Sequence, residues 1–259
     1  MPKFFNNFGT NKQGLIVYGG ESSSDYGMVV AEAPSFERPQ RKQTTYSVPG
    51  RNGVILFQQN AWNDTTRSYK VWLAEAIEED SGGVRSGYLV EKVDAFEAML
   101  NSKVGYQRLT DNFEPDIFRL AYYSGGDDFS NQMTQYGEAT IRFNCRPERF
   151  LLSGDSFVTV ANGGSITNPT KFDSKPLIKI TVSSTQTITV AIAGTAITAN
   201  VDDYIYIDCE AMNAYRQEGE NKNTDISGTF PVIKANSSNA IVITGTVTKV
   251  EIKPRFYTI

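Results

Sequence analysis

The sequence contains no histidine in 259 residues. Histidine is the commonest general base near neutral pH, the usual partner of a nucleophilic serine or cysteine, and the commonest metal ligand. Carboxylates, lysine and tyrosine could still support catalysis, but no P-loop, GxSxG or HExxH motif is present. We therefore expect a protein that is not an enzyme and that holds no cofactor and no metal.

Other features are scarce as well. No stretch approaches the roughly 18 apolar residues of a membrane-spanning helix, and the first residues lack a signal-peptide pattern, so we expect synthesis in a cytoplasm and no membrane partner. Acidic residues outnumber basic ones by 29 to 25, a net charge of −4 that does not favour tight nucleic-acid binding.

The two cysteines, Cys145 and Cys209, lie in strand-like alternating patterns. We expect buried free thiols there, not a disulfide framework.

The second half of the chain, from about residue 151, is almost wholly β in character. Thr, Ile and Val dominate residues 177–200, and apolar residues alternate with polar ones through 204–209. No helical period appears there. This pattern predicts a β-sandwich or jelly-roll domain over 151–259.

The first half, residues 1–150, combines strand patterns with one helix. Leu89, Val93, Phe96 and Leu100 recur at helical spacing, which predicts a helix over about 88–100 with one face buried against a sheet. We therefore predict a β-sandwich-like N-terminal domain with a single α-helix, and a mainly β protein as a whole.

A basic stretch at 34–53 interrupts the first half. It contains Pro34, Pro39 and Pro49. Proline fixes φ and removes a backbone donor, so this stretch cannot be a helix or a central strand. We predict an extended arm or edge over about 34–53, with strand character resuming at 54–57.

Carboxylates gather around one predicted strand of the second half, at Asp202, Asp203, Asp208 and Glu210. Paired carboxylates can cleave glycosides or bind Ca²⁺, but the simpler interpretation is a solvated strand face, and this is what we expect. Tryptophan can stack on sugar rings. The two tryptophans, Trp62 and Trp72, lie in the first half, where we expect them to help pack the first domain.

Several short segments together resemble the bacteriophage distal tail (Dit) protein family of phages with long non-contractile tails. They are YSVPGRNG at 46–53, FNCRP at 143–147, NP at 168–169 followed by SKPLI at 174–178, GTFP at 228–231 and KVEIKPR at 249–255. The first is similar to the family's VPGRxG signature. The next resembles the end of a strand, and the remaining ones resemble the opening and closing segments of the family's galectin-like second domain.

The resemblance implies a structural protein at the tail tip of a virion, assembled in the host bacterial cytoplasm. It implies a hexameric ring with galectin-like domains outside, joining the tail tube to the tail-associated tip protein, carrying baseplate or receptor-binding subunits, and leaving a channel for DNA. In the family, the segment before the VPGRxG turn wraps a neighbouring subunit. The resemblance therefore marks a candidate subunit-contact turn and arm, with these residues: Arg38, Pro39, Tyr46, Val48, Pro49, Gly50, Arg51 and Gly53.

A function of a different class stays open. A carbohydrate-binding module or host-glycan adhesin would also use a β-sandwich, and it predicts a monomer with measurable saccharide affinity. A glycan-degrading enzyme is disfavoured by the absence of histidine. The native mass and a glycan-binding assay distinguish these hypotheses.

Overall fold

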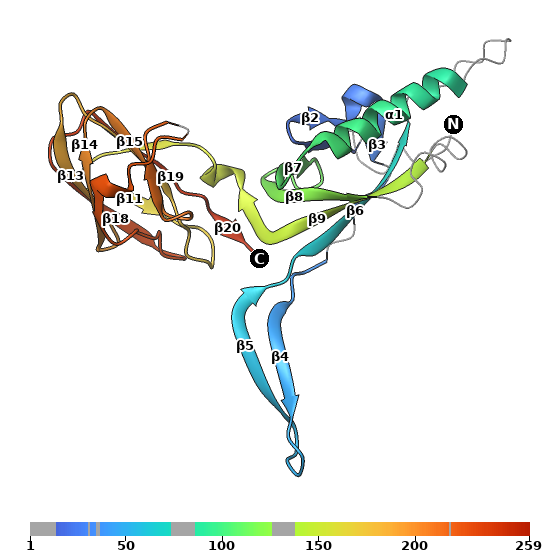
Figure 1. Ribbon diagram of the computed structural model, residues 1–259, viewed down its shortest axis with the longest axis horizontal. Helices are drawn as coiled ribbons and strands as arrows, with labels where there is room; N and C mark the ends of the chain where they lie inside the picture. Colours follow the sequence, from blue (N-terminus) through green and yellow to red (C-terminus); the bar gives the residue numbers. More distant parts are fainter. Residues whose placement is uncertain (1–13, 31, 35–36, 74–85, 126–137, 218) are drawn as a thin grey trace. The chain divides into compact units, whose positions relative to one another are not determined.

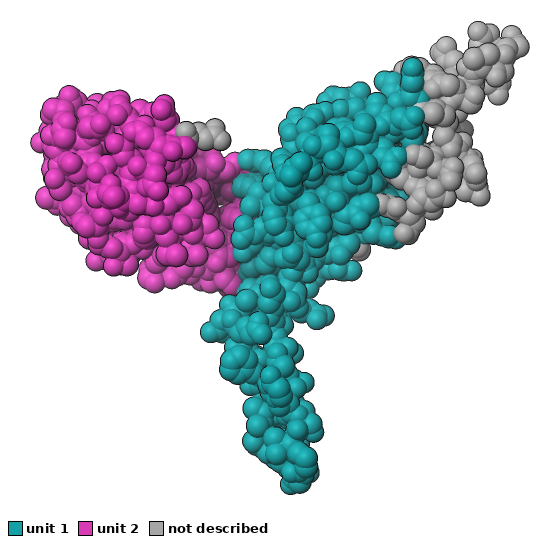
Figure 2. Space-filling model, in the orientation of Figure 1, with its two compact units in different colours: residues 1–149, 259 teal, residues 150–258 magenta. Residues whose placement is uncertain are grey.

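The computed structural model describes residues 14–30, 32–34, 37–73, 86–125, 138–217 and 219–259, and within the helix the side chains from residue 91 onward. The chain divides into two compact units, with the division between Arg149 and Phe150 (Figure 2). Each unit has its own hydrophobic core. Among the described residues, no helix has the length and hydropathy needed to cross a membrane.

Unit 1 is built on one sheet with the strand order β2-β1-β7-β8-β9-β6-β3. Its strands are β1 (Ile16–Tyr18), β2 (Glu21–Ser22), β3 (Met28–Val30), β6 (Thr65–Leu73), β7 (Gln107–Asp111), β8 (Ile117–Gly125) and β9 (Glu138–Leu151). Each pair whose register is described is antiparallel, and β6 pairs with β9 from Thr65 to Trp72. Side chains alternate along these strands, so each strand contributes one face to the core.

The predicted helix is present as α1 (Ser86–Ser102), and Figure 1 shows it beside the strands of unit 1. Val93, Phe96 and Leu100 are buried in the core, whereas the Leu89 side chain lies outside the described residues. A short 3₁₀-helix, η2 (Ser23–Tyr26), packs beside it, with the rings of Tyr26 and Phe96 5.7 Å apart. The helical period in the sequence therefore predicted this element correctly, because its apolar stripe meets a sheet.

Two strands of unit 1 lie outside this sheet. β4 (Arg41–Ser47) and β5 (Val54–Trp62) pair only with each other and form a hairpin that extends away from the other strands of the unit (Figure 1). The sequence predicted an arm that ends near Gly53 and a strand that resumes at 54–57. The strand exists, but it is the second half of the arm. A sequence pattern can indicate that apolar side chains are buried. It does not show whether the surface that buries them belongs to the same chain or to another one.

Unit 2 is a mainly β unit with two five-stranded sheets. One has the order β10 (Val158–Val160), β19 (Lys249–Lys253), β12 (Leu177–Thr181), β15 (Tyr204–Asp208) and β16 (Asn213–Tyr215). The other has the order β11 (Ser165–Thr167), β18 (Ser238–Thr244), β13 (Gln186–Ile192), β14 (Thr195–Val201) and β17 (Ile226–Gly228). Short elements complete the unit: η3 (Leu152–Gly154), η4 (Asn223–Asp225) and β20 (Tyr257–Thr258).

The core of unit 2 is formed almost entirely by isoleucine and valine from both sheets. In β13 and β15, for example, buried residues alternate with partly exposed ones, as the Thr/Ile/Val-rich sequence predicted. Both cysteines are buried and free, Cys145 in the core of unit 1 and Cys209 in that of unit 2. Burial raises the pKa of the Cys145 thiol to about 11 and that of Cys209 to about 12, so both are neutral and unreactive near neutral pH.

Candidate assembly surface

The arm, defined here as residues 38–63, has a closed base and a tight tip. At the base, the Asn63 N–H donates to the Gln40 carbonyl at 2.8 Å. At the tip, the Arg51 N–H donates to the Val48 carbonyl at 3.2 Å, and Gly50 has a φ of +79°. Pro49 followed by a glycine with positive φ is typical of a type II turn. The VPGRNG motif is thus the turn that joins β4 to β5.

The arm exposes large apolar side chains that its own fold does not cover. Relative exposure is 59% for Tyr46, 57% for Val54, 43% for Ile55, 50% for Leu56 and 61% for Phe57. An isolated two-stranded hairpin is marginally stable in water, and a contiguous exposed apolar patch of this kind marks a protein interface. The arm therefore has the chemistry of a contact surface for another protein.

The arm is also the basic part of an acidic chain. It carries Arg38, Arg41, Lys42 and Arg51 and no carboxylate. With four of the 25 basic residues and none of the 29 acidic ones in the arm, the rest of the chain has a formal charge of −8, against −4 for the whole. Among the residues that the structure describes, no carboxylate pairs with these four cations. An acidic surface would therefore complement the charge of the arm.

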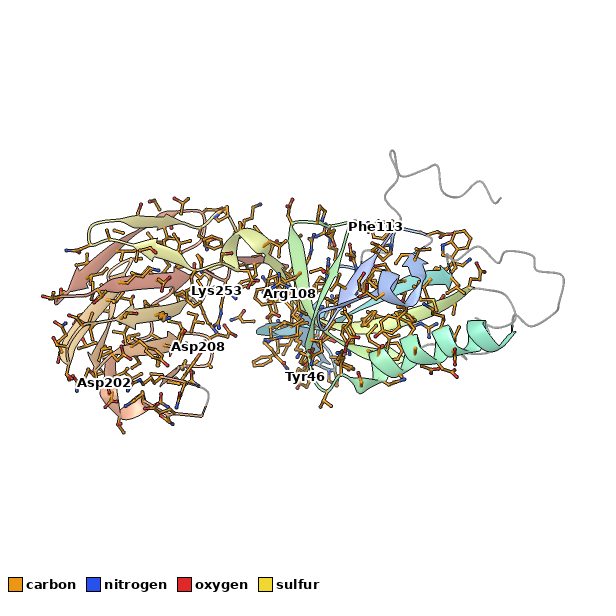
Figure 3. All side chains as sticks on the ribbon, turned by 90° about the horizontal axis from the view of Figure 1, so that it is seen from above. Tyr46, Arg108, Phe113, Asp202, Asp208 and Lys253 are labelled. Carbon is orange, nitrogen blue, oxygen red and sulfur yellow. The ribbon has the colours of Figure 1, made fainter. Side chains whose placement is uncertain are left out.

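The candidate contact residues predicted from the sequence all lie on the arm. Arg38 and Pro39 precede β4, and Tyr46 lies near the end of β4 (Figure 3). Val48, Pro49, Gly50, Arg51 and Gly53 form the exposed turn. Sequence reasoning missed the residues of β5, although its run of four consecutive apolar side chains, Val54–Phe57, is typical of a strand buried on both sides.

The two tryptophans lie at different places in unit 1. Trp62 lies at the base of the arm, where the Arg41 guanidinium stacks on its ring 4.5 Å from the centroid. Trp72 is on β6, on the opposite face from the buried Tyr69 and Val71. Neither belongs to the buried core of unit 1. Both residues are half-buried, so their packing in unit 1 lies outside its fully buried core.

The carboxylate group of unit 2 forms ion pairs. Asp202 and Asp203 each lie 3.0 Å from a different Nη of Arg216, and Glu210 lies 3.4 Å from Lys175. Within the described parts of the chain, no group of His, Cys, Asp and Glu side chains is arranged to hold a metal ion. The solvated-face interpretation thus fits these three carboxylates, which are exposed to a similar degree.

Asp208, labelled in Figure 3, differs from its neighbours because its side chain is largely buried. Both its oxygens accept from Arg255, at 2.7 and 2.9 Å, and Oδ1 also accepts from the N–H groups of Glu210 and Ala211. Burial alone would raise its pKa, but the Arg255 guanidinium and these N–H groups together lower the pKa of Asp208 below its ordinary value. A solvated face was the wrong prediction for this residue, which anchors a turn to the end of the chain.

Unit 1 contains a buried ionic cluster that sequence reasoning did not find. Arg67 Nη2 and the Tyr69 hydroxyl donate to Asp111 Oδ2 at 2.8 and 2.6 Å. Asp111 Oδ1 accepts from the N–H groups of Phe113 and Glu114. Burial, and then the Asp111 charge, raise the pKa of Tyr69 well above its ordinary value. The cluster fixes the turn after β7 to β6.

Glu114 extends this cluster. Its carboxylate pairs with Arg119 and Arg149 and lies 3.1 Å from Arg67. Burial opposes its charge, but these guanidinium groups lower the pKa of Glu114. Because every partner is a structural group of the same unit, the cluster stabilises the fold and gives no free catalytic group.

A row of aromatic side chains lies on the outer face of the β10-β19-β12-β15-β16 sheet. Tyr206 pairs in register with Tyr215 on one side and with Lys179 on the other. The two rings stack 5.3 Å apart, and Lys179 Nζ lies 5.3 Å from the Tyr206 ring. Tyr204 has Lys179 and Arg216 near its ring. The contacts of these rings are thus with one another and with neighbouring cations of the same sheet.

Comparison with solved structures identifies the architecture. The crystal structure of SPP1 Dit (gp 19.1), described as a paradigm of the hub adsorption apparatus in phages that infect Gram-positive bacteria, matches with a TM-score of 0.68. The match covers 96% of this chain and 100% of the SPP1 protein, at 13% sequence identity. The chain has a Dit fold. No family model and no curated protein matches the sequence.

The match to the Dit fold extends over both units, because it leaves only a small fraction of the chain uncovered. At 13% identity the likeness is one of backbone architecture. The short segments that first indicated it lie at structural landmarks. The VPGRNG motif is the arm turn, and FNCRP at 143–147 lies within β9, close to the division between the units.

Proposed function

We propose that this protein is a structural, non-catalytic distal tail protein that forms a hexameric ring at the tail tip of a phage. The ring joins the tail tube to the tail-associated tip protein, carries baseplate or receptor-binding subunits, and leaves a channel for DNA. The observation that carries the proposal is the exposed apolar arm on a chain whose whole length has a Dit fold.

An arm suits a ring. When one part of a subunit contacts a different part of the next, the interface is heterologous, and the repeated contact forms a ring when the rotation between subunits closes. A basic arm that docks on an acidic neighbour gives each subunit one donor surface and one acceptor surface. The single arm per chain thus supports a closed cyclic assembly.

The charge of the chain suits the passage of DNA. Outside the arm, the formal charge is −8. An anionic surface repels phosphate groups, whereas a basic one would bind them tightly. We propose that the channel is lined by acidic parts of the subunit and that the arms are buried between subunits, away from the DNA.

The test is removal of the arm. Because Gln40 and Asn63 are joined by a hydrogen bond at its base, residues 41–62 can be replaced by a short Gly-Ser turn without changing either core. We expect a protein that keeps the β-rich circular dichroism spectrum of the two cores and their melting profile, stays monomeric in light scattering and forms no rings in negative-stain images. The intact chain is the control. Rings that persist without the arm would contradict the proposal.

The carbohydrate-binding alternative makes the opposite prediction. It requires a monomeric intact chain that binds saccharide in a glycan-array or calorimetric experiment. The same preparation of intact protein therefore distinguishes the two functions.

A further inference from the structure

The dipeptide Asn-Gly occurs twice in the sequence, as Asn52-Gly53 and as Asn162-Gly163. Both pairs are exposed, and both glycines have a left-handed φ, +81° for Gly53 and +79° for Gly163. Because glycine has no Cβ, its backbone nitrogen is open to the side chain of the residue before it. The two pairs thus share their sequence, their exposure and the conformation of the glycine, so a difference in their chemistry has to come from their contacts.

The pair in unit 2 is held by strand β18. Asn162 Oδ1 accepts a hydrogen bond from the Ile243 N–H at 2.9 Å. The Gly163 N–H donates to the Ile241 carbonyl at 3.0 Å. Both the carboxamide of the asparagine and the backbone nitrogen of the glycine are therefore engaged, and neither can approach the other unless its hydrogen bond opens first.

The pair at the tip of the arm has no such restraint. Within the part of the chain that the structure describes, neither the Asn52 carboxamide nor the Gly53 N–H has a hydrogen-bond partner. A Cβ built on Gly53 would meet no atom within 4 Å, so the space around this nitrogen is open. The hydrogen bond of this turn joins Arg51 and Val48 and involves neither residue of the pair.

We propose that Asn52 is a site of spontaneous deamidation in the unassembled chain. The backbone nitrogen of Gly53 gives up its proton and attacks Cγ of Asn52. A bond from nitrogen to Cγ forms, the bond from Cγ to Nδ2 breaks, and Nδ2 takes up a proton and leaves as ammonia. Water then opens the five-membered imide at either carbonyl, which gives aspartate or isoaspartate. The reaction needs no oxidant and no enzyme, and asparagine is among the thermolabile residues.

Either product changes the charge of the arm. The arm has four basic residues and no acidic one, so one new carboxylate lowers its formal charge from +4 to +3 and takes the whole chain from −4 to −5. Isoaspartate also lengthens the backbone of the turn, because the chain then runs through the former side chain. The inference goes beyond the proposed function, since it requires only an exposed tip and not an assembly.

The experiment compares the two pairs within the same molecules. The intact chain is kept at mildly alkaline pH and at a dilution where light scattering gives the mass of the monomer. Peptides from a tryptic digest are quantified over time by mass spectrometry, and isoaspartate is counted with an isoaspartate methyltransferase. We expect Asn52 to convert about tenfold or more faster than Asn162. Equal rates, or faster conversion of Asn162, overturn the inference.

Two controls separate the effect of the fold from that of the local sequence. In urea that unfolds the chain, the hydrogen bonds to β18 are lost, so the two rates should lie within about threefold of each other. A tenfold difference that persists in urea overturns the structural explanation. In Asn52→Gln the additional methylene requires a six-membered ring, which closes more slowly, and the acidic form that ion exchange resolves in aged wild-type protein should not appear. If it still appears, the modified residue is not Asn52.

Discussion

At the scale of single residues, Asp208 does more than its strand position indicates. One carboxylate binds the guanidinium of Arg255 and the two N–H groups of the turn that follows β15. The sequence shows alternation along 204–209 and so places Asp208 outside the core correctly. It cannot show that a cation some 47 positions later returns to it, because ion pairs across a sandwich depend on the complete topology.

Replacing Asp208 by asparagine is expected to lower the free energy of unfolding by about 1–3 kcal/mol, because Arg255 stays largely buried without its counter-charge. The measurement is chemical denaturation of the full chain, followed by a probe of unit 2. Asp202→Asn is the matched control: its carboxylate is exposed, and exposed ion pairs contribute little to stability. Equal losses in both variants would contradict the assigned role.

The same pair gives a pH dependence. The pKa of Asp208 is lower in the folded protein than in the unfolded chain. The stabilising contribution of this carboxylate to the free energy of unfolding is therefore complete above the pKa of the unfolded chain, about 3.9. It is lost as the pH falls through the pKa of the folded protein. The stability difference between wild type and Asp208→Asn should narrow below about pH 4. A difference that stays constant from neutral to strongly acidic pH would rule out this ion pair as its source.

At the scale of elements, the helix and the arm show what a sequence pattern can predict. The spacing of Val93, Phe96 and Leu100 predicted α1 within a few residues, because the partner of its apolar stripe is in the same unit. The prolines of 34–53 predicted an extended segment outside the central sheet. The predicted end of the arm, at residue 53, was wrong. An apolar run such as that of β5 has the same sequence pattern whether its own domain or another protein covers it.

The arm turn depends on Gly50. Its φ of +79° is a conformation that L side chains rarely adopt, although a Cβ there would meet nothing within 4 Å. Gly50→Ala should therefore destabilise the hairpin by about 1 kcal/mol and weaken association of copies several-fold, measured by concentration-dependent light scattering.

The melting temperature of both cores should not change in Gly50→Ala, because the arm lies outside them. Asn52→Ala is the control, since Asn52 is an exposed turn residue without a positive φ. A variant Gly50→Ala that assembles like the wild type would show that the turn geometry is not needed for docking.

At the scale of the whole molecule, charge is divided between arm and body. Attraction between a basic arm and an acidic neighbour is screened by salt, with a Debye length of about 10 Å at 0.1 M. We expect association to weaken as sodium chloride rises from low to moderate concentration, measured as native mass at fixed protein concentration. Arg41→Gln/Lys42→Gln should assemble less well at low salt and show a flatter dependence. Association that strengthens steadily with salt would mean that apolar burial alone drives assembly.

The mainly β architecture of the whole molecule could be predicted from the sequence, whereas the contacts between side chains distant in the sequence could not. Strand alternation and one amphipathic helix predict a mainly β chain, and the order of a few short motifs resembles the Dit family. The buried Arg67–Asp111–Glu114 cluster could not be predicted, since its members come from β6, β7 and the turn after β7. In the sequence, a charged residue at an inward strand position only interrupts the alternation of apolar and polar residues. Its partners become visible once the strand order is known.

The closed base of the arm has a consequence for how such a subunit can change. Since the chain leaves and re-enters the body at two hydrogen-bonded neighbours, Gln40 and Asn63, the hairpin is an interchangeable module. Its length, tip and apolar sequence can vary, or be exchanged for those of another subunit, while the body keeps its backbone path. If the arm joins subunits as proposed, exchanging this one short stretch of sequence between two related proteins should exchange their choice of partner subunit.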